Sequence, residues 1–236
     1  MQDSPLIDIN IAKVTQAWAE SQNISCDFHH TLESTNTLAK NDAFNGLDAI
    51  QVYVTEEQTA GRGRADRKWV SPKAGTSLLS SWSFRSAQAP SPYLTAQIGK
   101  SLLFAARSTW PYLDFQLKAP NDLLIETKKV AGLLVETISQ GDQFRIIIGL
   151  GINILTSPVG LTEATHLMSA LLQKKLPLLG EDWIQFLDRW LFEICLVIPE
   201  AHLELTATQK SILVSAFNHS QKSYKNFDQL EEDLWR

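Results

Sequence analysis

Four short apolar segments follow one another in the middle of this chain, with no helix-length segment between them. They cover residues 115–118, 123–126, 130–138 and 144–154. The turn sequence Gln140-Gly141-Asp142 predicts that the last two form a hairpin. Strands that follow one another through tight turns pair in antiparallel fashion, because a parallel pair needs a long crossover. Further strands are expected at residues 26–32, 50–55 and 78–84.

Apolar residues recur at helical spacing on both sides of this strand region. The strongest pattern, residues 181–197, carries Trp183 and Trp190 on one apolar face and is stopped by Pro199. Weaker patterns predict helices at residues 7–21, at 35–44 after Ser34 as N-cap, from Ser91-Pro92 onward, and after Thr206 or Thr208. This arrangement predicts an α+β fold, a mainly antiparallel mixed sheet flanked by helices.

The composition is that of an ordinary globular protein, and it argues against several classes of function. The 236 residues suit one generous domain, and a net charge of −5 argues against a general polyanion binder. The chain contains no apolar run of the roughly 18 residues that a membrane helix needs. Residues 1–10 lack the basic start of a secretory signal. We therefore expect no membrane and no nucleic-acid partner.

The two cysteines, Cys26 and Cys195, lie far apart and form no disulfide framework, which indicates a reducing, cytoplasmic setting. Cys26 is close to His29 and His30, but no second pair of ligands accompanies them, so no metal site is predicted. Changes of pattern divide the chain into a helical extension at 1–25, a domain at 26–199 that holds every candidate site, and a helical, polar segment at 200–236.

The most unusual segment is residues 58–69, in which two glycines and four cations lie within an otherwise acidic chain. The cations are Arg62, Arg64, Arg67 and Lys68. Glycine lets the backbone approach a ligand, and the forked guanidinium of arginine suits carboxylate and phosphate oxygens. A solvated basic loop is the alternative, since the spacing matches neither a Walker A loop nor a dinucleotide-binding turn. Trp69, next to these cations, is a candidate stacking platform for an aromatic base.

Two further motifs lie on the predicted strands. Residues 118–122 read Lys-Ala-Pro-Asn-Asp, and Lys129 starts the next strand, so Lys118 and Lys129 are expected to face one site across a hairpin. Pro-Asn-Asp is also ordinary turn chemistry, which leaves a purely structural role open. Residues 149–153 read Gly-Leu-Gly-Ile-Asn, and glycines within a strand indicate either a close approach by a ligand or another backbone, or a β-bulge.

Taken in order, these motifs closely resemble those of the biotin protein ligases. They are Glu33-Ser34-Thr35-Asn36, Gln58-Thr59-Ala60-Gly61-Arg62-Gly63-Arg64 with Arg67-Lys68-Trp69, Pro120-Asn121-Asp122-Leu123, Lys129-Val130-Ala131-Gly132 and Gly149-Leu150-Gly151-Ile152-Asn153. The resemblance covers roughly residues 26–155. Several motifs in the right order are far more specific than any one of them alone.

The resemblance implies the fold of that family's catalytic domain and a reaction in two steps. Biotin's carboxylate attacks the α-phosphorus of Mg-ATP to form biotinyl-5'-adenylate and pyrophosphate, and a lysine of a biotin carboxyl carrier domain then takes the biotinyl group. The expected small molecules are therefore biotin, ATP and Mg²⁺, and the expected partner is the carrier domain of a carboxylase. The first step brings two anions together, which requires cationic donors. The protein is expected to be a monomer or a weak homodimer.

The resemblance also implies roles for residues of this sequence. Biotin binding falls to Ser34, Thr35, Asn36, Gln58, Gly61, Arg62, Gly63, Arg64, Lys129 and Gly132. ATP and adenylate binding falls to Arg64, Arg67, Trp69, Asn121, Lys129 and Asn153. Catalysis falls to Arg64, Lys118, Asp122 and Lys129. Asp122 would orient or help to deprotonate the incoming lysine, whose amine is mostly protonated at neutral pH.

The sequence departs from the family pattern at three places. Ala119 stands where the family usually has tryptophan, and Asp66 stands where glycine is common and is expected to pair with Arg64 or Arg67. A C-terminal β-barrel is not recognisable in residues 200–236, and the first 25 residues are too short for a helix-turn-helix domain. Two alternatives stay open: a lipoate or octanoate transferase of the same superfamily, and a homologue that binds biotin or its adenylate without turnover.

Overall fold

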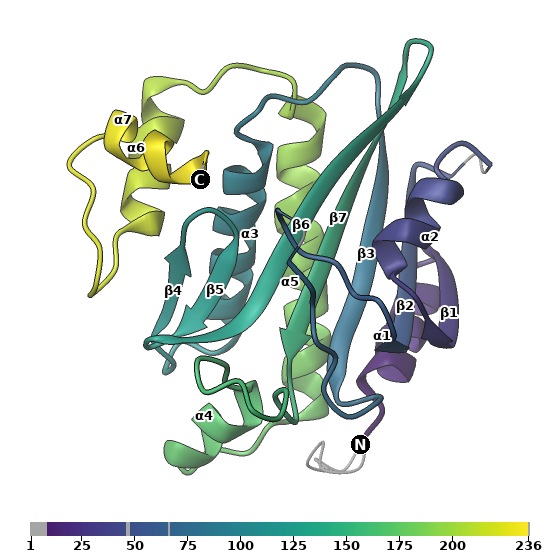
Figure 1. The fold of residues 1–236 in the computed structure, drawn as a ribbon, viewed down its shortest axis with the longest axis vertical. Helices are drawn as coiled ribbons and strands as arrows, with labels where there is room; N and C mark the ends of the chain where they lie inside the picture. The colour runs from purple at the N-terminus through teal and green to yellow at the C-terminus, as the bar shows by residue number, and fades with distance from the viewer. Residues whose placement is uncertain (1–8, 46–47, 66, 236) are drawn as a thin grey trace.

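The computed structural model describes residues 9–45, 48–65 and 67–235. Within them, seven strands form one sheet in the order β1-β2-β3-β7-β6-β5-β4 (Figure 1). The strands are β1 (Ser25–Leu32), β2 (Ile50–Gln58), β3 (Ser77–Ser86), β4 (Phe115–Lys118), β5 (Asp122–Ile125), β6 (Lys128–Gln140) and β7 (Gln143–Asn153). Strands β1 and β2 are parallel and the other neighbouring pairs are antiparallel, which confirms the predicted mixed, mainly antiparallel sheet.

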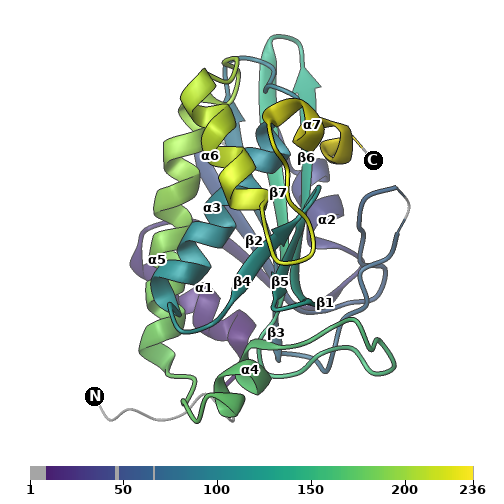
Figure 2. The same ribbon diagram turned by 90° about the vertical axis from the view of Figure 1, so that its left-hand side faces the viewer.

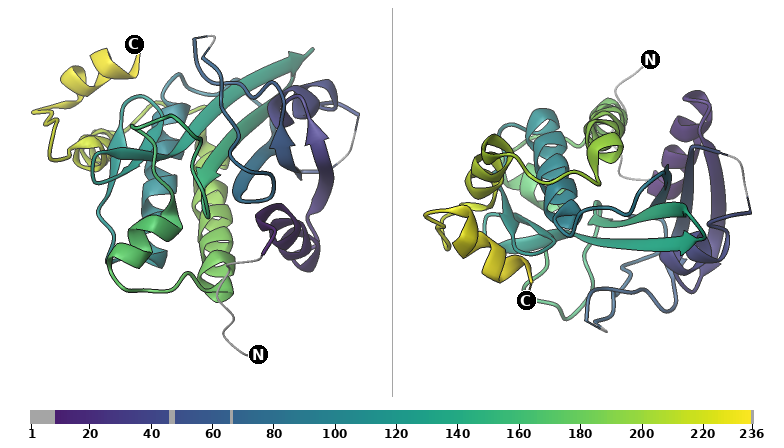
Figure 3. Two further views of the ribbon diagram at one scale, coloured as in Figure 1. Left: turned by 60° about the horizontal axis from the view of Figure 1, so that its bottom comes forward. Right: turned by 90° about the horizontal axis from the view of Figure 1, so that it is seen from above.

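Helices precede, interrupt and follow the strands. They are α1 (Ile11–Ser21), α2 (Thr35–Asn41), α3 (Leu94–Thr109), α4 (Leu167–Gln173), α5 (Gly180–Val197), α6 (Ala207–Phe217) and α7 (Phe227–Leu234), with a 3-10 helix η2 (Ile198–Glu200) after α5. Helices α3 and α5 lie side by side on one face of the sheet (Figure 2). Seen from above, the loop between β2 and β3 lies on the other face (Figure 3).

The two faces of the sheet differ because successive residues of a strand point to opposite sides. On β7, the even-numbered residues from 146 to 152 join the main core under the helices. Ile147 points the other way and packs with Ala39 of α2 in a small second core. Gly149 and Gly151 follow Ile147 on that side, so this face of β7 carries no large side chain at the motif residues.

Three buried tryptophans join the main core across elements distant in sequence. The ring centroid of Trp82 in β3 lies 5.7 Å from that of Trp18 in α1 and 6.3 Å from that of Trp190 in α5. Trp18 Nε1 also donates a hydrogen bond to Asp188 Oδ1 of α5 at 2.7 Å. The predicted apolar face of residues 181–197 is therefore confirmed, and the helix gives way to η2 at Pro199 as expected.

The predicted start of α2 is confirmed, and a contact distant in sequence holds its first residue. Ser34 occupies the N-cap position, but its side chain makes no capping hydrogen bond. The N–H of Thr35 donates to Oε1 of Gln58 at the end of β2, at 2.8 Å. The helix ends at Asn41 rather than Phe44, and residues 42–45 form a turn.

The other helix boundaries also shift. Helix α3 begins at Leu94 rather than at Pro92, because residues 91–94 form a turn in which the N–H of Leu94 donates to the carbonyl of Ser91 at 3.1 Å. Helix α1 begins at Ile11, and the part of its prediction at residues 7 and 8 lies outside the described residues. Helices α4 and α7 have no counterpart in the sequence-based expectations.

The C-terminal segment forms helices that pack beside the edge strand β4. Helix α6 contacts α3 and β4, and Ser220 after it donates a hydrogen bond to Gln116 Oε1 of β4 at 3.3 Å. Between residues 200 and 235, as far as the structure describes them, no strand occurs, in agreement with the helical prediction. None of the helices in the described ranges combines the length and the apolar character that a membrane span requires.

Removing the cap of α6 is expected to destabilise the protein modestly. Thr206 Oγ1 accepts a hydrogen bond from the N–H of Gln209, and the Gln209 side chain accepts one from the N–H of Thr206, which together form a capping box. Thr206→Ala should lower the free energy of unfolding by about 1 kcal/mol. The matched control is the exposed Thr208, the second residue of the helix. Urea unfolding in which Thr208→Ala loses as much stability as Thr206→Ala would contradict the assignment.

Candidate functional site

A cavity opens on the second face of the sheet, between β6, β7, the start of α2 and the loop after β2. It is lined by Ser34, Thr35, Asn36, Gln58, Arg62, Gly63, Arg64, Arg67, Lys68, Trp69, Ser80, Asn121, Asp122, Lys129, Gly132, Leu133, Leu134, Gly149, Leu150 and Gly151. Most of the residues selected from the sequence therefore meet at one place, although they come from five separate motifs. Gly61, Lys118 and Asn153 do not line this cavity.

The basic loop forms one wall of the cavity and is folded on itself rather than extended into solvent. The N–H of Trp69 donates to the carbonyl of Gly61 at 3.0 Å, and the N–H of Gly63 donates to the carbonyl of Arg67 at 2.7 Å. Arg62 and Lys68 form an isolated β-bridge between these contacts. The segment is thus a narrow hairpin-like loop, and it presents Arg62, Arg64 and Arg67 to the cavity.

The glycines of β6 and β7 make room for Trp69. Gly132 and Gly151 are directly paired in the sheet. A Cβ atom at Gly151 would lie 2.7 Å from Trp69 Cζ2, and one at Gly132 would lie 3.3 Å from Trp69 Cζ3. The indole therefore lies flat on a bare patch of sheet, and the close approach expected for this motif is made by a side chain. The alternative of a β-bulge is wrong, because the pairing of β6 with β7 is regular through these residues.

Polar groups at one end of the cavity are held by one another. Besides the Thr35 backbone, the Thr35 hydroxyl donates to Gln58 Oε1 at 3.2 Å. Ser81 Oγ lies 2.8 Å from Thr35 Oγ1 and also bonds to Asn36 Oδ1. The Asn36 amide donates to the carbonyl of Leu134 at 3.1 Å, so its orientation is fixed from both sides. Ser81 belongs to this group, but its own sequence context carries no motif that would have selected it.

A lysine and a carboxylate form the other end. Lys129 Nζ lies 2.7 Å from Asp122 Oδ1 and 5.7 Å from the centroid of the Trp69 ring. The backbone of Lys129 is tied to a neighbouring loop, because its N–H donates to the carbonyl of Glu163 at 2.8 Å. Lys129 thus combines a fixed backbone with a half-exposed ammonium group at the rim of the cavity.

Lys118 and Lys129 were expected to face one site, but only Lys129 lines the cavity. Lys118 is exposed at the end of the edge strand β4 and does not line the cavity. After burial, its charge is the next cause that lowers the pKa of His219, which places it toward the C-terminal segment. The predicted hairpin is confirmed, since Lys118 pairs with Asp122 across it, but Lys118 stands at the exposed edge of the sheet.

Arg64 connects the cavity to the C-terminal helix. Its Nη1 donates to the carbonyl oxygen of Leu234 in α7 at 3.4 Å. Burial lowers the pKa of the Arg64 guanidinium, and the nearby charge of Arg67 lowers it further. An arginine nevertheless stays protonated at neutral pH. The expected pairing of Asp66 with Arg64 or Arg67 falls on a residue outside the described ones.

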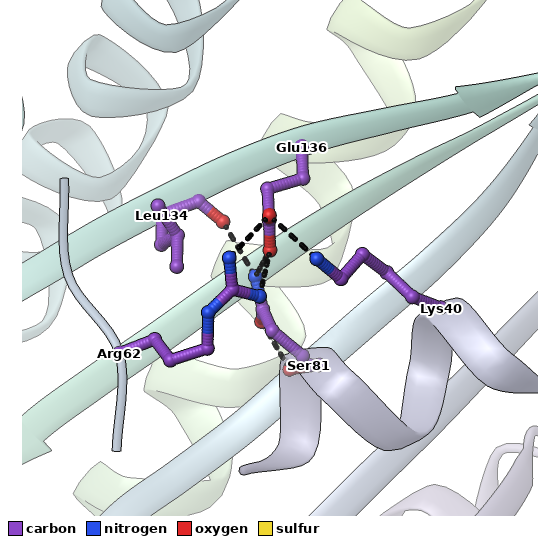
Figure 4. Close-up of polar contacts among 6 residues, drawn as sticks. Lys40, Arg62, Ser81, Leu134 and Glu136 are labelled. Carbon is purple, nitrogen blue, oxygen red and sulfur yellow. Dashed lines mark hydrogen bonds and ion pairs between the residues drawn. The ribbon is translucent and has the colours of Figure 1, made fainter. Parts of the chain in front are cut away.

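Arg62 is paired within the protein. Its two terminal nitrogens donate to the two carboxylate oxygens of Glu136 on β6, at 3.1 and 3.0 Å (Figure 4). Lys40 of α2 donates to the same carboxylate at 2.9 Å. Burial raises the pKa of Glu136, but hydrogen bonds from Asn36, Lys40 and Arg62 outweigh it and the pKa is lowered overall. Neither Glu136 nor Lys40 was selected from the sequence, since each lies far along the chain from its partners.

The remaining expected ligands for the nucleotide are placed differently. The Asn121 amide donates to the carbonyl of Leu133, so it is bound to β6 while it borders the cavity. Asn153 donates to the carbonyl of Thr165 at 3.1 Å and lies beyond the cavity lining. Asn153 Oδ1 and Trp69 Nε1 are buried polar atoms without a hydrogen-bond partner among the described residues.

The cysteines contribute nothing to the cavity. Burial, followed by the charges of Glu20 and Asp27, raises the pKa of Cys26 to about 12. Cys195 is exposed on α5, on the opposite side of the sheet, and both thiols are free. Among the described residues there is no group of three or more histidine, cysteine, aspartate or glutamate side chains that could hold a metal ion.

Known proteins share this sequence pattern. The profile of the Biotin/lipoate A/B protein ligase family matches residues 28–153. The bifunctional ligase/repressor BirA of Escherichia coli (strain K12) is 38% identical over 128 residues, which cover 52% of this chain and 38% of that protein. The biotin acetyl-CoA-carboxylase ligase of Paracoccus denitrificans is 32% identical over 133 residues, which cover 51% of this chain and 55% of that protein. The chain thus matches about half the length of these relatives or less.

A solved structure shows the same fold. The biotin protein ligase from Leishmania major in complex with biotinyl-5-AMP superposes with a TM-score of 0.65 at 24% identity, and the superposition covers 86% of this chain and 85% of that one. At this sequence identity the structural similarity establishes the fold alone. The superposed part of the chain is longer than residues 28–153, which match the family profile.

Proposed function

We propose, from the premise that this chain belongs to the biotin/lipoate A/B protein ligase family, that it activates biotin with ATP as biotinyl-5'-adenylate and transfers the biotinyl group to a protein lysine. The observation that carries the proposal is the convergence in one cavity of polar side chains at one end and cationic side chains at the other. Thr35, Asn36 and Gln58 form the first group, and Arg64 and Lys129 belong to the second.

In the first step, an oxygen of the biotin carboxylate attacks the α-phosphorus of ATP, the bond to the bridging oxygen breaks, and pyrophosphate leaves. Both reactants are anions, so donors placed where the charge develops lower the barrier. Arg64, Arg67 and Lys129 supply such donors around the cavity. Trp69 offers an aromatic face beside them, suited to packing against adenine.

In the second step, the amine of the acceptor lysine attacks the carbonyl carbon of the adenylate, and AMP leaves. The attacking amine must first lose a proton, because its pKa of about 10.4 keeps it charged at neutral pH. Asp122 is the carboxylate at the cavity that would accept or orient this ammonium group. Since Asp122 pairs with Lys129 at 2.7 Å, the incoming lysine would compete with Lys129 for it. The acceptor we propose is the biotin carrier domain of a carboxylase.

Magnesium would arrive with the nucleotide. Mg²⁺ usually keeps several waters and is bound by one or two carboxylates together with substrate phosphates. The cavity offers Asp122 as a single carboxylate and the described residues hold no larger cluster of ligands, which fits an ion carried mainly by the phosphates. Its contribution when bound would be to neutralise charge on the leaving pyrophosphate.

An octanoate transferase is the weaker alternative. Octanoyl transferases need a nucleophilic cysteine, and a thiolate is the reactive form. Cys26 lies outside the cavity, and burial raises its pKa to about 12, so it stays a thiol. Cys195 is on the other side of the sheet. Neither cysteine supports a thioester intermediate.

The test of the function is exchange of labelled pyrophosphate into ATP. Exchange that depends on biotin, with mass spectrometry showing a gain of one biotinyl group on a carrier-domain lysine, is the expected result. The same two measurements with lipoate and with octanoate separate the related acyl transferases. Tight biotin binding by calorimetry without exchange would favour a binding protein over an enzyme, and the proposal would then fail.

A further inference from the structure

Glu136 lies beside the cavity, outside its lining, and the proposed chemistry gives it no role. Its side chain points from β6 toward the site, on the same face as Gly132 and Leu134. Both reactants of the proposed first step are anions, so a carboxylate close to the biotin end would repel them if its charge were free. The structure compensates this charge fully with groups drawn from two other segments.

Three donors converge on this one carboxylate (Figure 4). Arg62 comes from the basic loop and binds both oxygens, while Lys40 and Asn36 come from α2 and donate at 2.9 Å each. The Glu136 side chain is only 20% exposed, and Lys40 is 28% exposed. A two-pronged arginine–carboxylate pair of this kind is geometrically specific, and partial burial makes it stronger than a fully exposed pair.

The pairing decides what Arg62 is free to do. Both terminal nitrogens of Arg62 are bound to Glu136, so the donors at the end of its guanidinium are engaged within the protein. Arg64, two residues later, bonds instead to a backbone carbonyl, which leaves its charge uncompensated by that contact. Two arginines that look equivalent in the sequence therefore have different roles: Arg62 ties the loop to β6, and Arg64 offers charge to the cavity.

The same carboxylate fixes Asn36. With its amide nitrogen bound to Glu136 and Leu134, Asn36 presents its oxygen to Ser81, whose hydroxyl also meets Thr35. A change at Glu136 is therefore felt both in the loop that covers the cavity and in the polar group at its biotin end. Both elements lie far from Glu136 along the chain: Lys40 of α2 is 96 residues away and Arg62 of the loop is 74 residues away.

We propose that Glu136 is a positioning residue that holds the basic loop closed against α2 and orients Asn36, so that the biotin end of the cavity is formed before the ligand arrives. The assignment to biotin rests on the proposed function. The positioning of the loop does not, because it rests on contacts within the protein itself. Preorganisation of this kind increases affinity by removing the cost of ordering the site on binding.

Opening of the loop can be measured with trypsin, which cleaves after arginine and lysine, because residues 62–68 hold four such sites. Limited proteolysis of the full chain, with fragments identified by mass spectrometry, measures how often this loop opens. Glu136→Gln should raise the cleavage rate within the loop about tenfold, the equivalent of about 1.4 kcal/mol. Glu200→Gln is the matched control, because Glu200 is an exposed glutamate on the helical side of the molecule. A loop cleaved at the wild-type rate in Glu136→Gln, or cleavage that rises equally at sites throughout the chain, overturns the proposal.

Ligand measurements complete the test. Glu136→Gln should weaken biotin binding in calorimetry about tenfold and raise KM for biotin while KM for ATP stays the same. In a cycle with Arg62→Met, the double variant should lose much less than the product of the two single losses. Multiplicative losses, or equal changes in both KM values, overturn the role of Glu136. A wild-type protein that binds no biotin removes the proposed function, while the proteolysis comparison still decides whether Glu136 holds the loop.

Discussion

Replacing Lys129 by alanine is expected to slow biotin-dependent exchange of pyrophosphate into ATP by about a hundred- to a thousandfold. The ammonium group lies at the cavity rim, 2.7 Å from Asp122 and above the Trp69 ring. Its backbone is held by the loop at Glu163, so the donor is in place before the substrates bind. Loss of a preorganised charge of this kind acts on the transition state, and kcat should fall with kcat/KM.

Two neighbouring lysines provide the controls for this experiment. Lys128 is exposed and adjacent in sequence, while Lys118 is the second lysine that the sequence places near the site. Because neither lines the cavity, alanine at either position should leave the exchange rate within about threefold of wild type, as is usual for surface substitutions. Near-normal exchange in Lys129→Ala, or a loss in Lys118→Ala as large as in Lys129→Ala, would contradict the assignment of the cationic end.

The difference between the two lysines shows where sequence reasoning succeeds and where it stops. The strands on either side of the Pro-Asn-Asp turn are predicted correctly, because alternation and turn residues act over a few positions. Which of the two lysines reaches the cavity depends on the end of an edge strand and on the C-terminal segment beside it. That information is tertiary and has no local signal.

Capping shows the same limit. Ser34 occupies the N-cap position but makes no side-chain cap, and the N–H of Thr35 donates to Gln58, 23 positions further along the chain. The motif containing Gln58 was identified for its expected contact with a ligand, and the structure adds that the same side chain holds the start of α2. Local propensity predicts that a helix begins here, while the hydrogen-bond partner of its first N–H comes from a distant part of the chain.

The glycine motif was left open between a close approach by a ligand or another backbone and a β-bulge, and the structure shows a close approach by side chains. Gly149 and Gly151 alternate on the cavity face of β7, and the side chains above them are Asn36 and Trp69. These residues come from two other motifs, so three separate sequence signals describe one packed unit. The Glu136 cluster carries no signal at all, since an isolated glutamate on a strand is unremarkable until the fold brings Arg62 and Lys40 to it.

The largest combined effect on packing and binding is expected from Gly149→Ala. A Cβ atom there would overlap Asn36 Oδ1 and would lie 2.9 Å from Asn36 Cγ, well inside van der Waals contact. Asn36 cannot turn aside cheaply, because its amide is held by Glu136 and Leu134 and its oxygen by Ser81. Crowding a packed site costs about 1–3 kcal/mol of folding stability. Displacing a positioning group by about 1 Å lowers the rate of the chemical step about a hundredfold.

Gly99→Ala is the matched control, since the nearest atoms to a Cβ at Gly99 in α3 lie at 3.7 to 3.9 Å, an ordinary contact distance. It should raise stability by about 0.5–1 kcal/mol, as alanine does in a helix, and leave exchange unchanged.

Shortening the opposing side chain separates the two effects of Gly149→Ala. The double variant with Asn36→Gly should regain most of the lost melting temperature but not biotin affinity in calorimetry, because the space is restored while the polar contact is not. Recovery of both by Asn36→Gly would mean that Asn36 only fills space, and Gly149→Ala with wild-type stability would mean that the contact itself is not formed.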